Sequence, residues 1–150
     1  MTNQTNPKLK GALVTFIVLQ LIYLFSFFTT FPDSLENALA FHSSTADMAA
    51  SWLSTITMLA YCILCLVSVV QLVLRKSGFL LWFQISGLVA LVGNFAVFVV
   101  RQVSGELYTY ASYRGAGYYW ALFIVALFWT VIWCMYFARS SRVFSYMGED

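Results

Sequence analysis

The sequence predicts an all-α integral membrane protein that folds as an antiparallel four-helix bundle, and three observations support this fold class. Four stretches, residues 11–32, 48–74, 77–100 and 115–138, contain no charged residue. Each is long enough to cross a hydrocarbon core, which takes about 20 apolar residues in a helix. Only 9% of the 150 residues are charged, whereas a soluble domain has about 25%. Residues 1–150 are therefore expected to form a single transmembrane domain.

The distribution of charge predicts how this domain is oriented. Six of the eight basic residues lie on one predicted side of the membrane: Lys8, Lys10, Arg75, Lys76, Arg139 and Arg142. The loops on the other side, residues 33–47 and 101–114, hold the two remaining basic residues and four acidic ones. Lys and Arg in short loops stay on the cytoplasmic face. Both termini are therefore predicted inside, in a multi-pass protein of the bacterial inner (cytoplasmic) membrane.

The first predicted span covers residues 11–28, and a short outer helix is expected after it. Pro32 disfavours helix in the residue before it, and Asp33 opens a new helix-start pattern. Leu35, Ala38 and Leu39 then share one face. The sequence therefore predicts a short amphipathic helix that lies at the outer interface of the membrane.

Three further spans follow, at residues 49–74, 79–100 and 118–138. Ser44 to Asp47 have the pattern of a capping box, which begins the second span. The turn at Ser77 and Gly78 is short, so the second and third spans are predicted to be antiparallel neighbours. A tyrosine-rich outer loop leads into the fourth span.

The second span carries a polar stripe at helical spacing, made of Ser51, Ser54, Thr57, Tyr61, Cys65 and Ser68. Residues three or four apart share one face of a helix. Small and hydroxylated residues in membranes usually allow close helix contact. We therefore predict a packing seam between the second and third spans, formed by Ser54, Thr57, Tyr61, Gly87, Ala90 and Asn94. The alternative is a polar path, in a small-solute or lipid transporter or channel that works as an oligomer.

Asn94 and Gln20 are the most polar residues near the middle of the spans. Amide side chains in this position usually hydrogen-bond to a neighbouring helix, each bond being worth about 0.6 kcal/mol. Contact with a ligand is the other interpretation.

Cys62 and Cys65 form a C-x-x-C motif within the second span. A motif of this kind performs the chemistry in four-helix membrane thiol oxidoreductases, where it needs an accessible thiolate and a second cysteine pair. The only other cysteine here is Cys134. A thiol oxidoreductase that uses Cys62 and Cys65 is therefore the second alternative, and small buried apolar residues are the favoured interpretation.

The outer loop before the fourth span is dense in aromatic residues. Tyr and Trp favour the membrane interface, but Tyr, Trp and Arg are also enriched where proteins bind partners. The loop is thus either an aromatic belt or a surface that contacts a lipid head group, a glycan or a partner protein. The residues of this surface are Tyr108, Tyr110, Tyr113, Arg114, Tyr118 and Trp120.

The end of the fourth span carries a sequence signature. Residues 133–143 read W-C-M-Y-F-A-R-S-S-R-V. This resembles W-x-x-Y-F-x-x-S-x-R-V, the signature of the YdgK-like bacterial family of small four-helix inner-membrane proteins of unknown function. The start of the chain is also similar, although Ala12 stands where that family usually has Trp. The resemblance implies an inner-membrane location with both termini inside, and no assigned activity.

The same segment has a physical interpretation. Trp133, Tyr136 and Ser140 share one face of a helix by their spacing. Together with Arg142 they are expected at the cytoplasmic interface, where Trp, Tyr and Arg anchor a span. The alternative is a docking site for a partner.

Taken together, these features favour a non-enzymatic accessory or interaction subunit of a membrane complex. Its expected partners are the lipid bilayer and either another membrane protein or further copies of the chain. No cofactor is expected. No metal site is expected either, because His42 is the only histidine and one residue cannot hold a metal. Basic residues occur only in pairs, so nucleic-acid binding is not expected.

Overall fold

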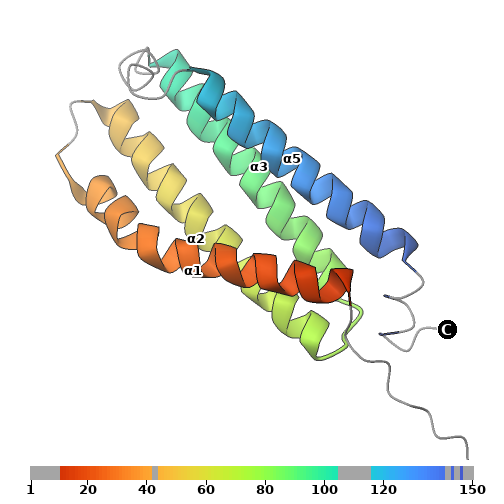
Figure 1. Cartoon of the computed structure of the whole chain (residues 1–150). Helices are drawn as coiled ribbons and strands as arrows, with labels where there is room; N and C mark the ends of the chain where they lie inside the picture. The colour runs from red at the N-terminus through yellow and green to blue at the C-terminus, as the bar shows by residue number, and fades with distance from the viewer. Residues whose placement is uncertain (1–10, 42–43, 105–115, 141–142, 144–145, 147–150) are drawn as a thin grey trace, which may run out of the picture.

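The described residues of the computed structural model, which are 11–41, 44–104, 116–140, 143 and 146, form four helices. The helices are α1 (Ala12–Leu39), α2 (Thr45–Val73), α3 (Phe79–Val103) and α5 (Ala116–Arg139). Helices α1, α2 and α3 are long and apolar enough to cross a membrane, and α5 contains the shorter apolar stretch Phe123–Arg139. In Figure 1, α3 runs between α2 and α5 while α1 crosses them obliquely. The predicted all-helical architecture with four helices is confirmed.

Helix α1 continues far beyond the predicted end of the first span. The prediction of a separate outer helix after residue 28 is wrong, because α1 passes through Pro32 without interruption. Proline removes one backbone hydrogen bond and bends a helix, and Figure 1 shows α1 bending toward its C-terminal end. Beyond the bend, the Ser34 and Thr55 hydroxyl oxygens lie 2.9 Å apart, and Thr55 Oγ1 also lies 3.2 Å from the Ser34 carbonyl oxygen. This contact with α2 holds the end of α1 in the bundle.

The turn between α2 and α3 is built on Arg75. The Lys76 N–H donates to the Gln71 carbonyl at 2.9 Å, and the Arg75 N–H donates to the Leu72 carbonyl at 3.1 Å. Arg75 has a φ of 56°, in the left-handed region. This is the Schellman arrangement that closes a helix. The predicted turn residues Ser77 and Gly78 complete the connection, and Gly78, with right-handed backbone angles, is the N-cap of α3.

Two glycines of α3 allow its neighbours to approach closely. A Cβ built on Gly93 would lie 2.8 Å from the Cβ of Thr57 on α2, and a Cβ built on Gly87 would lie 3.2 Å from the Cβ of Thr130 on α5. Gly93 is thus the glycine of the α2–α3 contact. Gly87, which was predicted to belong to that seam, instead lies against α5.

Gly93→Ala is expected to lower the free energy of unfolding by about 1–2 kcal/mol, because the added methyl group overlaps Thr57 and forces the two helices apart. The measurement is thermal unfolding in detergent, followed by circular dichroism. Gly117→Ala is the matched control, since no atom lies within 4 Å of a Cβ built there. Adding Thr57→Gly, which removes the Cβ that the new methyl group meets at 2.8 Å, should restore part of the loss. If Gly93→Ala and Gly117→Ala unfold alike, the close contact is not formed.

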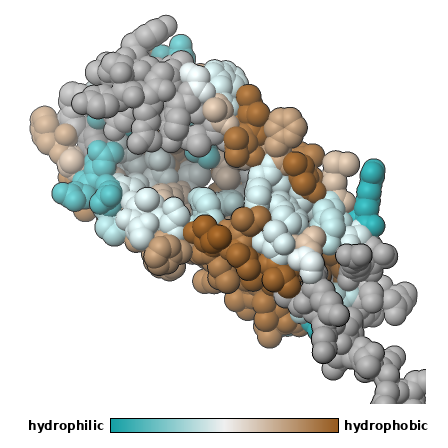
Figure 2. Space-filling view, viewed as in Figure 1, coloured by the Kyte–Doolittle hydropathy of each residue, from teal (hydrophilic) through white to brown (hydrophobic). Residues whose placement is uncertain are grey.

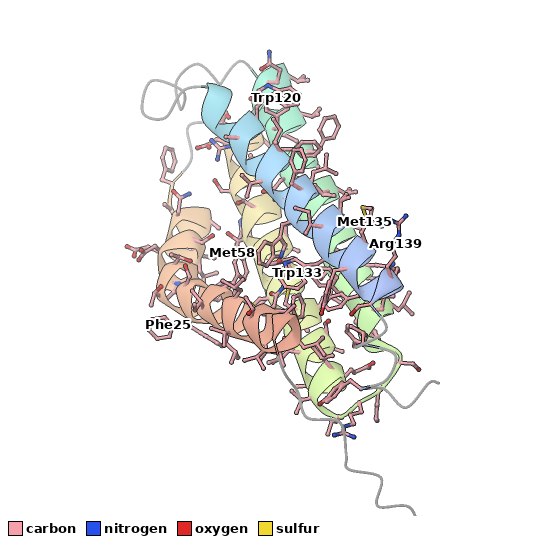
Figure 3. All side chains as sticks on the ribbon, turned by 45° about the vertical axis from the view of Figure 1, so that its right-hand side comes forward. Phe25, Met58, Trp120, Trp133, Met135 and Arg139 are labelled. Atoms are coloured by element: carbon pink, nitrogen blue, oxygen red, sulfur yellow. The ribbon has the colours of Figure 1, made fainter. Side chains whose placement is uncertain are left out.

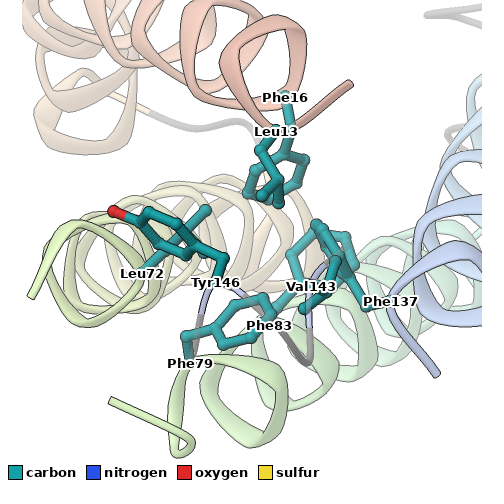
Figure 4. Packing of buried hydrophobic residues seen from close by; sticks show 8 residues of the cluster. All are labelled: Leu13, Phe16, Leu72, Phe79, Phe83, Phe137, Val143 and Tyr146. Atoms are coloured by element: carbon teal, nitrogen blue, oxygen red, sulfur yellow. The ribbon is translucent and has the colours of Figure 1, made fainter. Parts of the chain in front are cut away.

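One end of the bundle is closed by an aromatic cluster that draws residues from all four helices (Figure 4). Phe16 of α1 is completely buried, and its ring centroid lies 5.2 Å from that of Phe83 and 4.8 Å from that of Phe137. The members of the aromatic cluster are Leu13, Phe16, Leu72, Phe79, Phe83, Phe137, Val143 and Tyr146. Arg75 lies over the Tyr146 ring, 4.7 Å from its centroid. The cluster therefore fixes α1, α3 and α5 to each other and to the α2–α3 turn.

The outer surface is apolar over the middle of the molecule. Large apolar side chains are exposed on every helix, such as Ile22, Ile63, Leu88 and Phe128, and Figure 2 shows brown apolar patches between teal residues that lie toward the two ends. Among the described residues, Arg75, Lys76 and Arg139 form a basic end. Asp33, Glu36 and Asp47 lie at the opposite, acidic end together with Arg101.

Candidate functional site

A central cavity of about 430 Å³ lies between the four helices. Every helix contributes to its wall, so the cavity exists only in the assembled bundle. The lining residues are Leu19, Gln20 and Tyr23 of α1, Tyr61 of α2, Ala90 and Asn94 of α3, and Val125, Ala126, Trp129 and Thr130 of α5. The volume is within the range of about 300–1,000 Å³ that is usual for small-molecule sites.

Gln20 is the most deeply buried polar residue in this wall. Its side chain is 2% exposed, and within the part of the chain that the structure describes its Nε2 has no hydrogen-bond partner. A buried amide without a partner costs roughly 1–3 kcal/mol. An unsatisfied donor of this kind calls for an explanation, such as a bound molecule.

Some other polar side chains of the wall already donate hydrogen bonds to backbone carbonyls of their own helices. The Thr130 hydroxyl donates to the Ala126 carbonyl at 2.9 Å, and Asn94 Nδ2 donates to the Ala90 carbonyl at 2.7 Å. One Asn94 donor hydrogen and its side-chain oxygen remain for other contacts. The Tyr23 and Tyr61 rings pack edge to face, with centroids 4.9 Å apart.

The cavity opens sideways between α1 and α5. The Phe16 ring holds these two helices together at one end, where it contacts the rings of Trp133 and Phe137. Figure 3 shows the helices close together near Trp133 and separating from there. Leu19 on α1 and Val125 on α5 line the cavity and are also exposed. The central cavity is therefore reached from the apolar flank of the molecule.

A second, smaller cavity of about 150 Å³ lies toward the acidic end. It is lined by Ser54, Asn94, Phe95, Val97, Phe98, Trp120 and Phe123. Asn94 belongs to the walls of both cavities. Ser54 and Asn94, which the sequence analysis assigned to a packing seam, line this smaller cavity, and Thr57 lies against Gly93 within the α2–α3 contact.

The remaining predicted packing residues, Tyr61 and Ala90, also line the central cavity. The sequence drew attention to Gln20 and Asn94 through their polarity. It gave no signal for Tyr23, Trp129 or Thr130, because apolar, aromatic and hydroxylated residues are common throughout such helices. Only the crossing of α1 over the other helices brings these side chains to one space.

The two predicted contact surfaces are described only in part. Trp120 packs against Phe98, with ring centroids 5.3 Å apart. Trp133 and Tyr136 pack against the aromatic cluster, and the Ser140 N–H donates to the Tyr136 carbonyl at 2.9 Å. The signature face of α5 therefore contributes to the core at the basic end. Outside the described residues lie Tyr108, Tyr110, Tyr113, Arg114, Arg142 and the side chain of Tyr118.

The thiols of the C-x-x-C motif are buried. Cys62 packs with Leu24 and Phe27 of α1. Cys65 is 1% exposed and lies beside the hydroxyl groups of Tyr61 and Ser86. All three cysteines carry thiols, and Cys134 is the most accessible of them.

We expect a bulky maleimide to label Cys134 in the folded protein and to leave Cys62 and Cys65 unmodified, because burial blocks the reagent. Mass spectrometry of tryptic peptides before and after denaturation in SDS measures the difference. Cys134→Ser supplies the control, since its folded form should then take up no label. Rapid labelling of Cys62 or Cys65 would favour the thiol oxidoreductase, the second alternative, over small buried apolar residues.

The described residues contain no group of three or more His, Cys, Asp or Glu side chains that could hold a metal ion. The polar groups that converge inside the bundle are amides, phenols and a threonine hydroxyl. These are hydrogen-bonding groups, which suit reversible binding. Comparison with protein-family models, curated proteins and solved structures found no match to this chain.

Proposed function

We propose that this chain is a non-enzymatic multi-pass protein of the bacterial inner membrane that acts by binding, as an accessory or interaction subunit of a membrane complex. The observation that carries the proposal is the central cavity, whose wall is built by all four helices and holds an unsatisfied amide. Such a wall offers contacts to a bound molecule.

The membrane location is supported by the surface of the helices. Exposed Ile, Leu, Val and Phe side chains occur on all four helices, and a large exposed apolar surface requires lipid or a partner to cover it. The basic end and the acidic end fit an orientation with Arg75, Lys76 and Arg139 in the cytoplasm, since short basic loops stay inside. We also propose membership of the YdgK-like family, for which the signature at residues 133–143 is the support.

Native mass spectrometry of C-terminally tagged protein, extracted gently from its own membranes, tests the proposed function. A stoichiometric membrane-protein partner is the expected result and would identify the complex. Tyr113→Ala with Arg114→Ala should then weaken the association if the outer aromatic loop makes the contact. A chain that is recovered without a protein partner at every detergent concentration would overturn the accessory role.

A small-solute or lipid transporter is the second candidate, because one side chain belongs to both interior spaces. The central cavity and the smaller cavity share Asn94. Solute flux into reconstituted vesicles that falls on Asn94→Leu would favour transport. Flux that is equal in the variant and the unmodified protein would exclude a path through Asn94.

A further inference from the structure

From the chemistry of its wall, we propose that the central cavity is a binding site for an uncharged, membrane-soluble molecule that carries a carbonyl group. The inference deepens the proposed binding function, on which it rests, by naming the class of ligand and its route of entry. The ligand takes its hydrogen bonds from the amides of Gln20 and Asn94, and it packs against the aromatic side chains of the wall.

The wall selects a hydrogen-bond acceptor. Gln20 Nε2 is a donor that has no partner among the described residues, and Asn94 retains one donor hydrogen after its bond to the Ala90 carbonyl. Tyr23, Tyr61 and Trp129 are side chains that can donate as well. The buried group that lacks a partner among the described residues is a donor, Gln20 Nε2, so the group that satisfies it is an acceptor, and a carbonyl oxygen accepts hydrogen bonds without bringing a donor of its own.

The residues of the wall also disfavour the binding of a charged ligand. Among the described residues, none of those that line the central cavity is Asp, Glu, Lys, Arg or His. An ion in this space would lose its hydration without gaining an opposite charge, which is strongly unfavourable. The body of the ligand is apolar, because Leu19, Val125 and Ala126 supply the rest of the surface.

The route of entry is the gap between α1 and α5. Leu19, Tyr23 and Val125 are exposed there, on the flank that also carries the apolar outer surface. Lipid-soluble molecules concentrate beside this flank, so a ligand enters without crossing water. The Phe16 contacts with Trp133 and Phe137 close the gap toward the basic end.

Photolabelling with benzophenone, a small neutral aromatic ketone, tests the inference on the full chain in lipid nanodiscs. Irradiation links the ketone to nearby C–H groups, and peptide mapping then locates the adducts. We expect saturable labelling of the segments 19–23 and 125–130, which face the central cavity from α1 and α5. The exposed outer face of α1 around Phe25 gives the non-saturable background in the same sample.

Two variants distinguish the cavity from the lipid surface. Ala126→Phe fills the space and should abolish saturable labelling. Gln20→Leu removes the amide at nearly constant volume, and we expect it to raise the apparent Kd about tenfold while the unfolding midpoint stays the same or rises. Gln102→Leu, an exposed change outside the cavity, should have no effect.

The inference is overturned if labelling never saturates, or if Ala126→Phe and Gln20→Leu label like the unmodified protein. It also fails if an aliphatic hydrocarbon of similar size competes as well as a second ketone does, since the amides would then have no role. These outcomes do not depend on whether a protein partner is recovered. The binding site and the accessory role can therefore fail separately.

Discussion

Phe16→Ala is expected to lower the free energy of unfolding by about 3 kcal/mol, the largest effect of any single substitution considered for this chain. Phe16 is fully buried, and its ring contacts those of Phe83, Trp133 and Phe137. The effect lies at the lower end of the range for soluble cores, because separated helices in lipid already keep apolar groups out of water. The variant loses the packing contacts of the Phe16 ring with the rings of Phe83, Trp133 and Phe137.

Titration of unfolding by SDS, followed by circular dichroism and tryptophan fluorescence, measures this loss. Phe25→Ala is the matched control: it removes the same side chain from the same helix, but Phe25 is 72% exposed and points away from the bundle (Figure 3). We expect the control to change stability by about 0.5 kcal/mol or less. Equal losses in the two variants would mean that α1 does not dock through Phe16.

Phe16→Ala also has an expected consequence for the central cavity. The contacts of Phe16 with Trp133 and Phe137 close the gap between α1 and α5 at one end. Without the ring, the gap should widen and solvent or detergent should reach Trp133. The chain has five tryptophans, so the emission is measured with the other four replaced by Phe, where a red shift in the folded variant would report that water reaches Trp133.

Much of the fold could be predicted from the sequence, because the helices are defined by local composition. The charge-free windows predicted α2 as residues 49–74 and α3 as 79–100, and the structure gives Thr45–Val73 and Phe79–Val103. The cap at Ser44 was also predicted correctly, since the Asp47 N–H donates to the Ser44 side chain at 3.0 Å. Patterns of this kind depend only on neighbouring residues.

The error at α1 shows where local patterns fail. Pro32 and Asp33 looked like a boundary, yet α1 runs through them to Leu39. Helical structure within a packed bundle tolerates proline when other groups satisfy the backbone and tertiary contacts support the distal segment. The hydrogen bonds between Ser34 and Thr55 join residues 21 positions apart, and no local pattern could reveal them.

The candidate site was harder to predict for the same reason. Gly87 and Gly93 are equivalent by composition, and only the positions of α2 and α5 decide that one faces Thr130 and the other Thr57. The central cavity depends on the angle at which α1 crosses the other helices. Polarity identified Gln20 and Asn94 as candidates, whereas their meeting at a single cavity is a property of the assembled bundle.

The second large effect is expected at the acidic end, where Asp47→Asn should cost about 2 kcal/mol. Asp47 lies at the start of α2 and pairs with Arg101 near the end of α3, with Oδ1 and Nη1 3.9 Å apart. Arg101 is 5% exposed. The Asp47 side chain is 23% exposed, so only the Arg101 end of the pair is buried. Removing the Asp47 carboxylate is destabilising, because the buried Arg101 charge loses an interaction with an opposite charge. Unfolding by SDS again gives the measurement.

A double-mutant cycle separates this pair from a general effect of charge. Replacing both partners, in Asp47→Asn with Arg101→Met, should recover much of the loss, since the uncharged pair leaves no buried charge without an opposite charge. Asp33→Asn, an exposed acid at the same end, should change stability by about 0.5 kcal/mol or less. If the effects of Asp47→Asn and Arg101→Met simply add, the two side chains do not interact.

The ion pair and the aromatic cluster hold opposite ends of the bundle, with the central cavity between them. Substitutions at distant sites without shared partners usually add to within about 0.5 kcal/mol. Phe16→Ala combined with Asp47→Asn should therefore lose the sum of the two effects, about 5 kcal/mol. A markedly smaller loss would mean that release of α1 at the basic end already loosens α2 and α3 at the acidic end. The bundle would then respond to changes at Phe16 as one unit, and α1 could not move over the cavity while the other helices stay fixed.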